Sequence, residues 1–224
     1  AVNLAIHILN GLIVFGIALA LFNVCPAFVA SAFFIVHPIQ TESVTYISSR
    51  SELLSTFFYL AALFLFMKWP KAKIGFILSL LVGILFLAGM SSKETVISLP
   101  LTIWLYDWLF LSDGRFFGFL KRWRFYQLNL LGAAFVAAYV LNTGLLRSVV
   151  ESAATSGWHY FLTQSRVIVR YIGLILWPIN LNLDHDVMIS SSIDPVVAAC
   201  GLFLTLLLWL AVFLHSRQPV LSFG

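Results

Sequence analysis

The residues of this chain that could do chemistry are densest between positions 37 and 52. This segment holds an imidazole, two carboxylates and a guanidinium, from His37, Glu42, Glu52 and Arg50, and apolar runs flank it on both sides. A charged side chain at the centre of a bilayer costs about 2.5–3.5 kcal/mol on insertion scales. The segment therefore predicts a polar site that lies at a membrane surface or lines a wet cavity.

The composition identifies the chain as an all-α polytopic membrane protein. Hydrophobic residues make up 61% of the 224 residues and charged residues 10%, whereas soluble domains carry about 25% charged residues. This excludes a soluble globular domain. The net charge of +4 is then a topology signal rather than a sign of nucleic-acid binding.

A spanning helix needs about 20 mostly apolar residues. We expect about seven such helices, at 4–22, 24–39, 53–67, 74–90, 95–111, 128–146 and 196–214. Pro100 predicts a kink in the fifth helix. In the first helix, Asn3, His7 and Asn10 form one stripe, which predicts hydrogen bonds between helices or, alternatively, a part in the site.

Residues 158–177 form an eighth segment, in which Arg166 and Arg170 share one helix face. We interpret it as an interfacial or re-entrant helix. The alternative is a full span. In our interpretation residues 1–224 are part of a single transmembrane domain, with an extracytoplasmic segment at 147–194.

Alternation of the expected helices collects most Lys and Arg residues on one side, which the positive-inside rule makes the cytoplasm. Three polar clusters then lie together on the opposite, extracytoplasmic side: residues 37–52, Lys93-Glu94 and Asp184-His185-Asp186. If residues 158–177 crossed the bilayer, the third cluster would move to the cytoplasm.

This combination of groups suits a lipid phosphate that is attacked by a polar nucleophile. Carboxylates can serve as a general base toward a hydroxyl or can hold a divalent cation, although no spacing requires a metal. Arg50 and Lys93 can hold a phosphate, Arg with a planar fork and Lys as a point charge. The alternative is that local ion pairs, Arg50 with Glu52 and Lys93 with Glu94, satisfy one another.

Four stretches resemble the motifs of one family. They are VNLAIHILN at 2–10, HPIQTESV at 37–44 with SRSELL at 49–54, SKET at 92–95, and LTQ at 162–164 leading to LDHD at 183–186. In this order and spacing they resemble the transmembrane and tetratricopeptide-repeat O-mannosyltransferases and their bacterial relatives, which are GT-C glycosyltransferases.

The resemblance implies a GT-C-like helical bundle in a bacterial inner membrane. Such an enzyme would move a sugar, a hexose such as mannose, from a polyprenyl-phosphate donor to a protein or glycan hydroxyl on the extracytoplasmic face. It implies catalytic roles for Glu42, Asp184 and Asp186. It implies substrate-binding roles for His37, Arg50, Lys93, Glu94, His185, Arg166 and Arg170, where the two last arginines could instead anchor an interfacial helix to lipid phosphates.

The resemblance also implies missing parts. The family's first helix and its acidic catalytic loop should precede Asn3, so we expect the main base to lie upstream and the repeats downstream. Glu52 stands where the family usually has Asp. Two other functions compete: a transporter or flippase for a lipid-linked or small anionic solute, which the lack of an internal repeat disfavours, and a non-catalytic membrane scaffold.

Overall fold

The computed structural model describes residues 1–69, 75–112, 116–123, 125–127, 129, 132, 134, 142, 157–179, 181, 190, 192–214 and 219–223. Every regular element among these residues is a helix, as expected. The chain divides into two compact units, one formed by residues 1–135 with Phe223 and the other by residues 136–222 with Gly224. Each unit is described by itself, and the single transmembrane domain stays a prediction.

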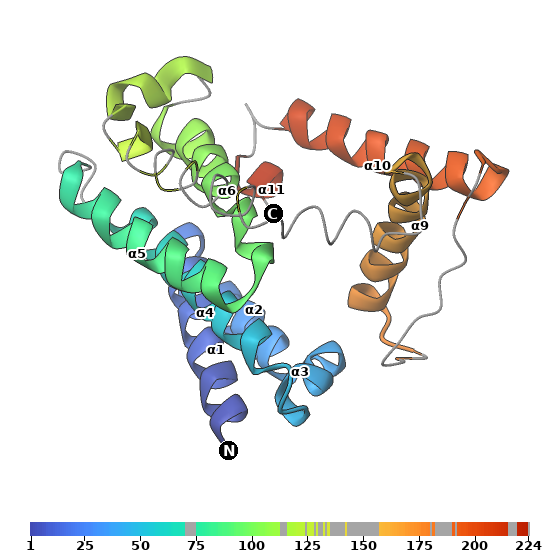
Figure 1. Cartoon of the computed structure of the whole chain (residues 1–224), viewed down its shortest axis with the longest axis horizontal. Coiled ribbons are helices and arrows are strands. Elements are labelled where there is room, and N and C mark those ends of the chain that lie inside the picture. Colours follow the sequence, from blue (N-terminus) through green and yellow to red (C-terminus); the bar gives the residue numbers. More distant parts are fainter. Residues whose placement is uncertain are drawn as a thin grey trace. The chain divides into compact units, whose positions relative to one another are not determined.

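Ten helical elements of the first unit are described (Figure 1). They are α1 (Val2–Leu21), α2 (Val24–Val36), η1 (Pro38–Gln40), α3 (Thr41–Thr45), α4 (Arg50–Lys68), α5 (Phe76–Ser92), η3 (Glu94–Ser98), α6 (Leu99–Tyr106), η4 (Asp107–Leu111) and η5 (Phe116–Arg122). The second unit contains α9 (Gly157–Leu176) and α10 (Pro195–Leu214), and a short helix, α11 (Pro219–Phe223), ends the described chain.

Among the described residues, three helices are long and apolar enough to cross a membrane: α1, α4 and α10. The bent pair formed by α2 and residues 38–45 would be a fourth span or a re-entrant loop, and α5 is a shorter apolar helix. The expected span at 128–146 lies almost entirely outside the described residues. A membrane protein is therefore consistent with the structure, while the count of seven spans is not confirmed.

The second apolar segment ends at Val36, three residues earlier than expected, because a proline follows His37. A residue before proline avoids the α conformation, and His37 is extended at φ −63° and ψ 128°. The chain then bends by 46° into residues 38–45. The polar motif thus lies on short helices and turns rather than on the end of a long helix.

The fifth expected helix, 95–111, is built from three pieces of different helical type. Pro100 lies in the first turn of α6, where proline is tolerated because its missing N–H needs no partner. The expected kink is therefore a helix start. A 3-10 turn, η3, precedes α6, and a π-helical turn, η4, follows it.

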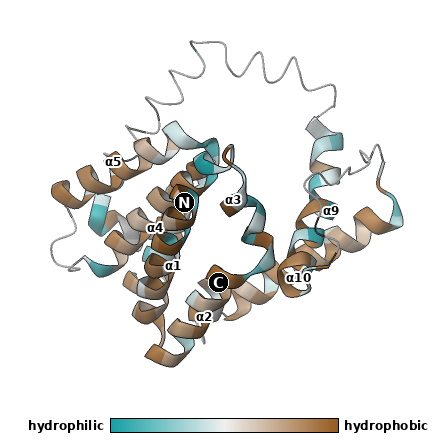
Figure 2. Cartoon of the chain, turned by 90° about the horizontal axis from the view of Figure 1, so that it is seen from below, coloured by the Kyte–Doolittle hydropathy of each residue, from teal (hydrophilic) through white to brown (hydrophobic). Residues whose placement is uncertain are grey.

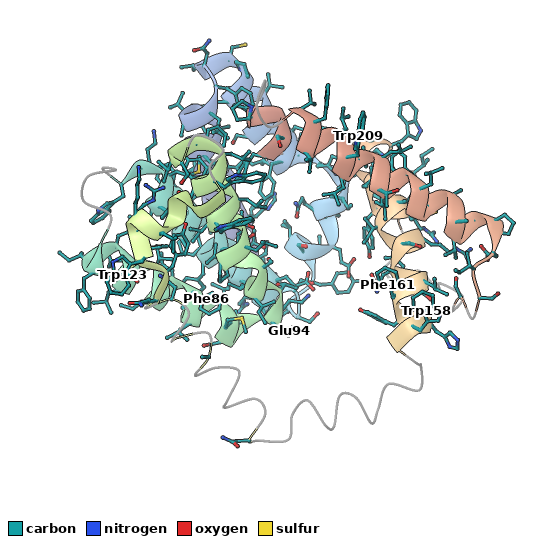
Figure 3. All side chains as sticks on the ribbon, turned by 90° about the horizontal axis from the view of Figure 1, so that it is seen from above. Phe86, Glu94, Trp123, Trp158, Phe161 and Trp209 are labelled. Carbon is teal, nitrogen blue, oxygen red and sulfur yellow. The ribbon has the colours of Figure 1, made fainter. Side chains whose placement is uncertain are left out.

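The core of the first unit lies between α4, α5 and α6. Phe66 of α4, Leu78, Val82 and Phe86 of α5 and Leu99 of α6 are all buried there; Figure 3 labels Phe86. Because α4 and α5 pack together along this core, the start of α4 and the end of α5 are held at the same end of the unit. Arg50 and Lys93 lie at those two helix ends.

In the second unit, α9 packs against α10, which is capped by Asp194: the Val197 N–H donates to Asp194 Oδ1 at 2.7 Å. Figure 2 shows hydrophilic residues along α9, whereas α10 is mostly hydrophobic. The exposed side chains of α9 include Trp158 and Phe161, which Figure 3 labels together with Trp209 of α10. The interfacial or re-entrant interpretation of α9 stays a prediction.

The close approach of α1 and α2 gives a first prediction. A Cβ at Gly11 would overlap the branched side chain of Ile35, so Gly11→Ala should lower the free energy of unfolding by about 1–3 kcal/mol. Gly173→Ala in α9 is the matched control, because nothing lies within 4 Å of its Cβ position. The midpoint of thermal unfolding in detergent measures both. Equal midpoints for the two variants would contradict this packing.

Candidate functional site

The polar stripe of α1 holds the segment that carries the His37 motif. Asn3 Nδ2 donates to the Tyr46 carbonyl at 2.7 Å, His7 Nε2 lies 3.0 Å from the Ile35 carbonyl, and Asn10 Nδ2 donates to the Leu53 carbonyl at 3.1 Å. The three side chains of the stripe are 7%, 2% and 0% exposed. The predicted hydrogen bonds between elements are therefore present, and their partners are backbone carbonyls.

These three carbonyls bracket the motif: one precedes residue 37, one lies within the motif and one follows Arg50. The carbonyl of Ile35 belongs to the last turn of α2, where helical acceptors have no partner further along the helix. Unpaired carbonyls in apolar surroundings cost free energy. Each bond of the stripe therefore fixes one part of the motif against α1.

Arg50 is held to the same stripe through its side chain. Its Nε donates to Asn3 Oδ1 at 3.3 Å, while the residue as a whole is exposed. Among the described residues, none pairs with its two terminal guanidinium nitrogens. The fork of Arg50 is thus anchored at one nitrogen and open at the other two.

Lys93 forms an ion pair with Glu52 across two elements. The two local pairs of the alternative interpretation, Arg50 with Glu52 and Lys93 with Glu94, are not present among the described contacts. The two side chains are 33% and 46% exposed, so solvent screens the pair. Lys93 itself is extended at φ −160°, at the break between α5 and η3. The pair therefore joins the start of α4 to the end of α5.

An open cavity of about 200 Å³ lies between α4 and η3. Its lining residues are Ser55, Thr56, Tyr59, Leu60, Thr95 and Val96. Hydroxyl groups thus come from both α4 and η3. The cavity is open to the surroundings.

The other candidates of the first unit are placed as follows. His37 is buried, and its Nδ1 accepts a hydrogen bond from the Ile39 N–H at 3.2 Å. Glu42 is exposed in the first turn of α3, and its carboxylate has no partner among the described residues. Glu94 is exposed in the first turn of η3 (Figure 3). The hydrogen bonds and the ion pair bring Asn3, Arg50, Glu52 and Lys93 to one end of the unit.

In the second unit, Arg166 Nη1 donates to Ser190 Oγ at 3.2 Å and lies 3.9 Å from Asp194 Oδ2. Arg170 is exposed. Asp184, His185 and Asp186 lie outside the described residues, so their part in the site stays a prediction. Within the described part of the chain, no three His, Cys, Asp or Glu side chains form a group that could hold a metal ion.

Sequence reasoning missed a second polar cluster, around Asp107. This side chain is fully buried. It accepts hydrogen bonds from Ser112 Oγ, Arg122 Nε and Tyr126 OH, each at 2.7 Å, and forms an ion pair with the guanidinium of Arg122. A lone aspartate inside the apolar run at 95–111 was the available signal, since such residues are costly without a partner.

The Asp107 cluster is saturated and therefore structural. Burial, followed by the hydrogen bond and the charge of Asp107, raises the pKa of the Tyr126 phenol, so this hydroxyl remains a donor. Every oxygen of the carboxylate is already paired. Arg50 differs from Asp107 in both respects. It is exposed, and its two terminal nitrogens remain available as donors to a ligand.

Removing the charge of Asp107 gives a second prediction. Asp107→Asn leaves the guanidinium of Arg122, 13% exposed, without its counter-ion, which should cost about 3–5 kcal/mol of folding free energy. Glu94→Gln, at an exposed carboxylate, should change stability by less than about 0.5 kcal/mol. Replacing both partners, with Arg122→Leu added to Asp107→Asn, should recover part of the loss.

Thermal unfolding in detergent separates these outcomes. A similar midpoint for Asp107→Asn and Glu94→Gln would show that the buried ion pair does not support the fold.

Comparison with known proteins adds to the motif resemblance. Over 82 residues the chain is 39% identical to Protein O-mannosyl-transferase F38B6.6 of Caenorhabditis elegans. This aligned stretch covers 37% of this chain and 11% of that protein. Over 74 residues the chain is 38% identical to Protein O-mannosyl-transferase TMTC3 of Homo sapiens. That stretch covers 30% of this chain and 8% of that protein. TMTC3 of Mus musculus matches to the same extent.

The chain spans about a tenth of the length of these curated relatives. No family model matches the chain, and no solved structure matches it. The resemblance expected from the sequence motifs is nevertheless confirmed: over part of its length, this chain is similar to the protein O-mannosyl-transferases.

Proposed function

We propose that this chain forms part of a membrane glycosyltransferase. The enzyme moves a hexose such as mannose from a polyprenyl-phosphate donor to a protein or glycan hydroxyl on the extracytoplasmic face of the membrane. Similarity to protein O-mannosyl-transferases supports a transferase that acts on hydroxyl groups. The observation that carries the proposal is the open guanidinium fork of Arg50, held at the exposed end of an apolar unit.

This geometry supports the proposed recognition of a phosphate. An Arg fork pairs with two phosphate oxygens through parallel hydrogen bonds, and the two terminal nitrogens of Arg50 have no partner among the described residues. Lys93 supplies a second cation at the same end of the unit. Its ammonium group has three donors, of which the Glu52 carboxylate takes one.

In the proposed reaction, the acceptor oxygen forms a bond to the anomeric carbon while the bond from that carbon to the phosphate oxygen breaks. The acceptor proton passes to a carboxylate, and the polyprenyl phosphate leaves with the negative charge that Arg50 and Lys93 stabilise. Glu42 is a suitable carboxylate for an acceptor or sugar contact, because it is exposed and has no partner among the described residues.

The remaining assignments are proposals of the same kind. Asp184 and Asp186 would contact the acceptor or the sugar, and His37 and His185 would hydrogen-bond within the site. Glu94 would line the site, and Arg166 and Arg170 would hold the donor headgroup or anchor α9 to lipid.

Neutralising Arg50 is the test of this function. In the full-length protein, Arg50→Ala should lower kcat/KM for sugar transfer by about 10- to 100-fold, because a hydrogen bond to a charged group contributes about 1.5–3 kcal/mol. Arg50→Lys should be intermediate, since it keeps the charge and loses the fork. Transfer from radiolabelled polyprenyl-phosphate hexoses to an acceptor is measured in proteoliposomes.

Lys68→Ala is the matched control, because it removes one exposed cation from the opposite end of the same helix. It should leave kcat/KM unchanged. Full activity of folded Arg50→Ala would remove Arg50 from the mechanism.

A further inference from the structure

We propose that Asn3 is a positioning residue that fixes the guanidinium of Arg50, so that its two terminal nitrogens face an incoming phosphate group. This inference rests on the proposed function, because it assumes that Arg50 binds the phosphate of a lipid donor. Asn3 itself would touch neither donor nor acceptor. It would act only through Arg50.

The orientation of the Asn3 amide follows from its two partners. A backbone carbonyl can only accept, so the amide nitrogen must face Tyr46, to whose carbonyl it donates at 2.7 Å. The amide oxygen is then left on the other side, where it accepts from Arg50 Nε at 3.3 Å. Because Asn3 is 7% exposed, the amide has little room to turn.

Anchoring at Nε selects one part of the guanidinium for the ligand. An exposed Arg side chain carries about 2 kcal/mol of rotamer entropy, and ordering it at the moment of binding weakens affinity. The bond to Asn3 orders the chain before the ligand arrives. It engages the nitrogen nearest the stem and leaves the two terminal nitrogens for a bidentate contact.

The residue type at position 3 suits this role. An amide oxygen is a neutral acceptor, so Arg50 keeps its full positive charge for the phosphate. A carboxylate at the same place would bind Nε as well, but it would neutralise the guanidinium and repel a phosphate. The positioning role therefore predicts that Asp is a worse substitute than its size suggests.

Asn10 provides an internal control. It belongs to the same stripe of α1, it is also buried, and its Nδ2 also donates to a backbone carbonyl, that of Leu53. Its Oδ1, however, has no hydrogen-bond partner among the described residues, so it does not bond to Arg50. Loss of either amide should weaken the fold, but only loss of Asn3 should weaken phosphate binding.

The experiment measures binding of undecaprenyl phosphate, and of undecaprenol as the probe without phosphate, to the full-length protein in detergent. The ratio of the two dissociation constants reports on the phosphate group alone. Asn3→Ala should lower this preference by about two- to tenfold, the range for ordering one long side chain. Asn3→Asp should lower it further, and Asn10→Ala should leave it unchanged.

The same substitutions in an Arg50→Lys background complete the test. Lys has no Nε to anchor, so Asn3→Ala should have no further effect there. If Asn3→Ala does not fold, Asn3→Ser replaces it, because a Ser hydroxyl keeps a donor but is too short to reach both partners.

The outcomes separate the two proposals. Equal preferences for the Asn3→Ala and Asn10→Ala proteins, or an Asn3→Ala effect that persists in the Arg50→Lys background, would overturn the positioning role alone. If Arg50→Ala leaves the preference for the phosphate unchanged, both the positioning role and the proposed phosphate site are overturned.

Discussion

The first unit depends on the need to pair polar groups inside an apolar protein. Buried carbonyls without donors are costly, and the Asn3, His7 and Asn10 side chains of α1 supply donors to backbone carbonyls where α2 ends, where the motif turns and where α4 begins. A hydrogen bond requires a particular distance and angle between donor and acceptor, whereas contacts between apolar side chains have no preferred direction. They fix the register of α1 against the motif, and apolar packing fills the space around them.

The same requirement produces two polar clusters with different roles. Asp107 is fully buried and all its acceptor positions are taken, by Ser112, Arg122 and Tyr126. This arrangement lowers the cost of a buried charge and leaves nothing to offer a ligand. Arg50 is exposed, anchored at one nitrogen and open at two. This is why we propose that the chemistry of this unit belongs to Arg50, which the fold leaves incompletely paired.

Helix boundaries show where sequence reasoning succeeded and where it was wrong. The apolar runs of α1, α4 and α10 were recognised because about 20 apolar residues have few alternatives to a helix. The second run ended early because Pro38 disfavours the α conformation at His37. The alternative interpretation paired Lys93 with the adjacent Glu94, but Lys93 pairs with Glu52, 41 positions away, because neighbouring helices bring their ends together.

The sequence by itself determined the all-helical class, the membrane character of the composition, and the motifs that relate the chain to protein O-mannosyl-transferases. It also indicated which residue types could hold a phosphate, because ionisable groups are rare in this chain. Only the tertiary structure decided which of them are already paired. Pairing depends on contacts between distant segments, such as Asn3 with Arg50 and Asp107 with Arg122. No local pattern encodes these distances, which arise when packing of the apolar faces sets the helices side by side.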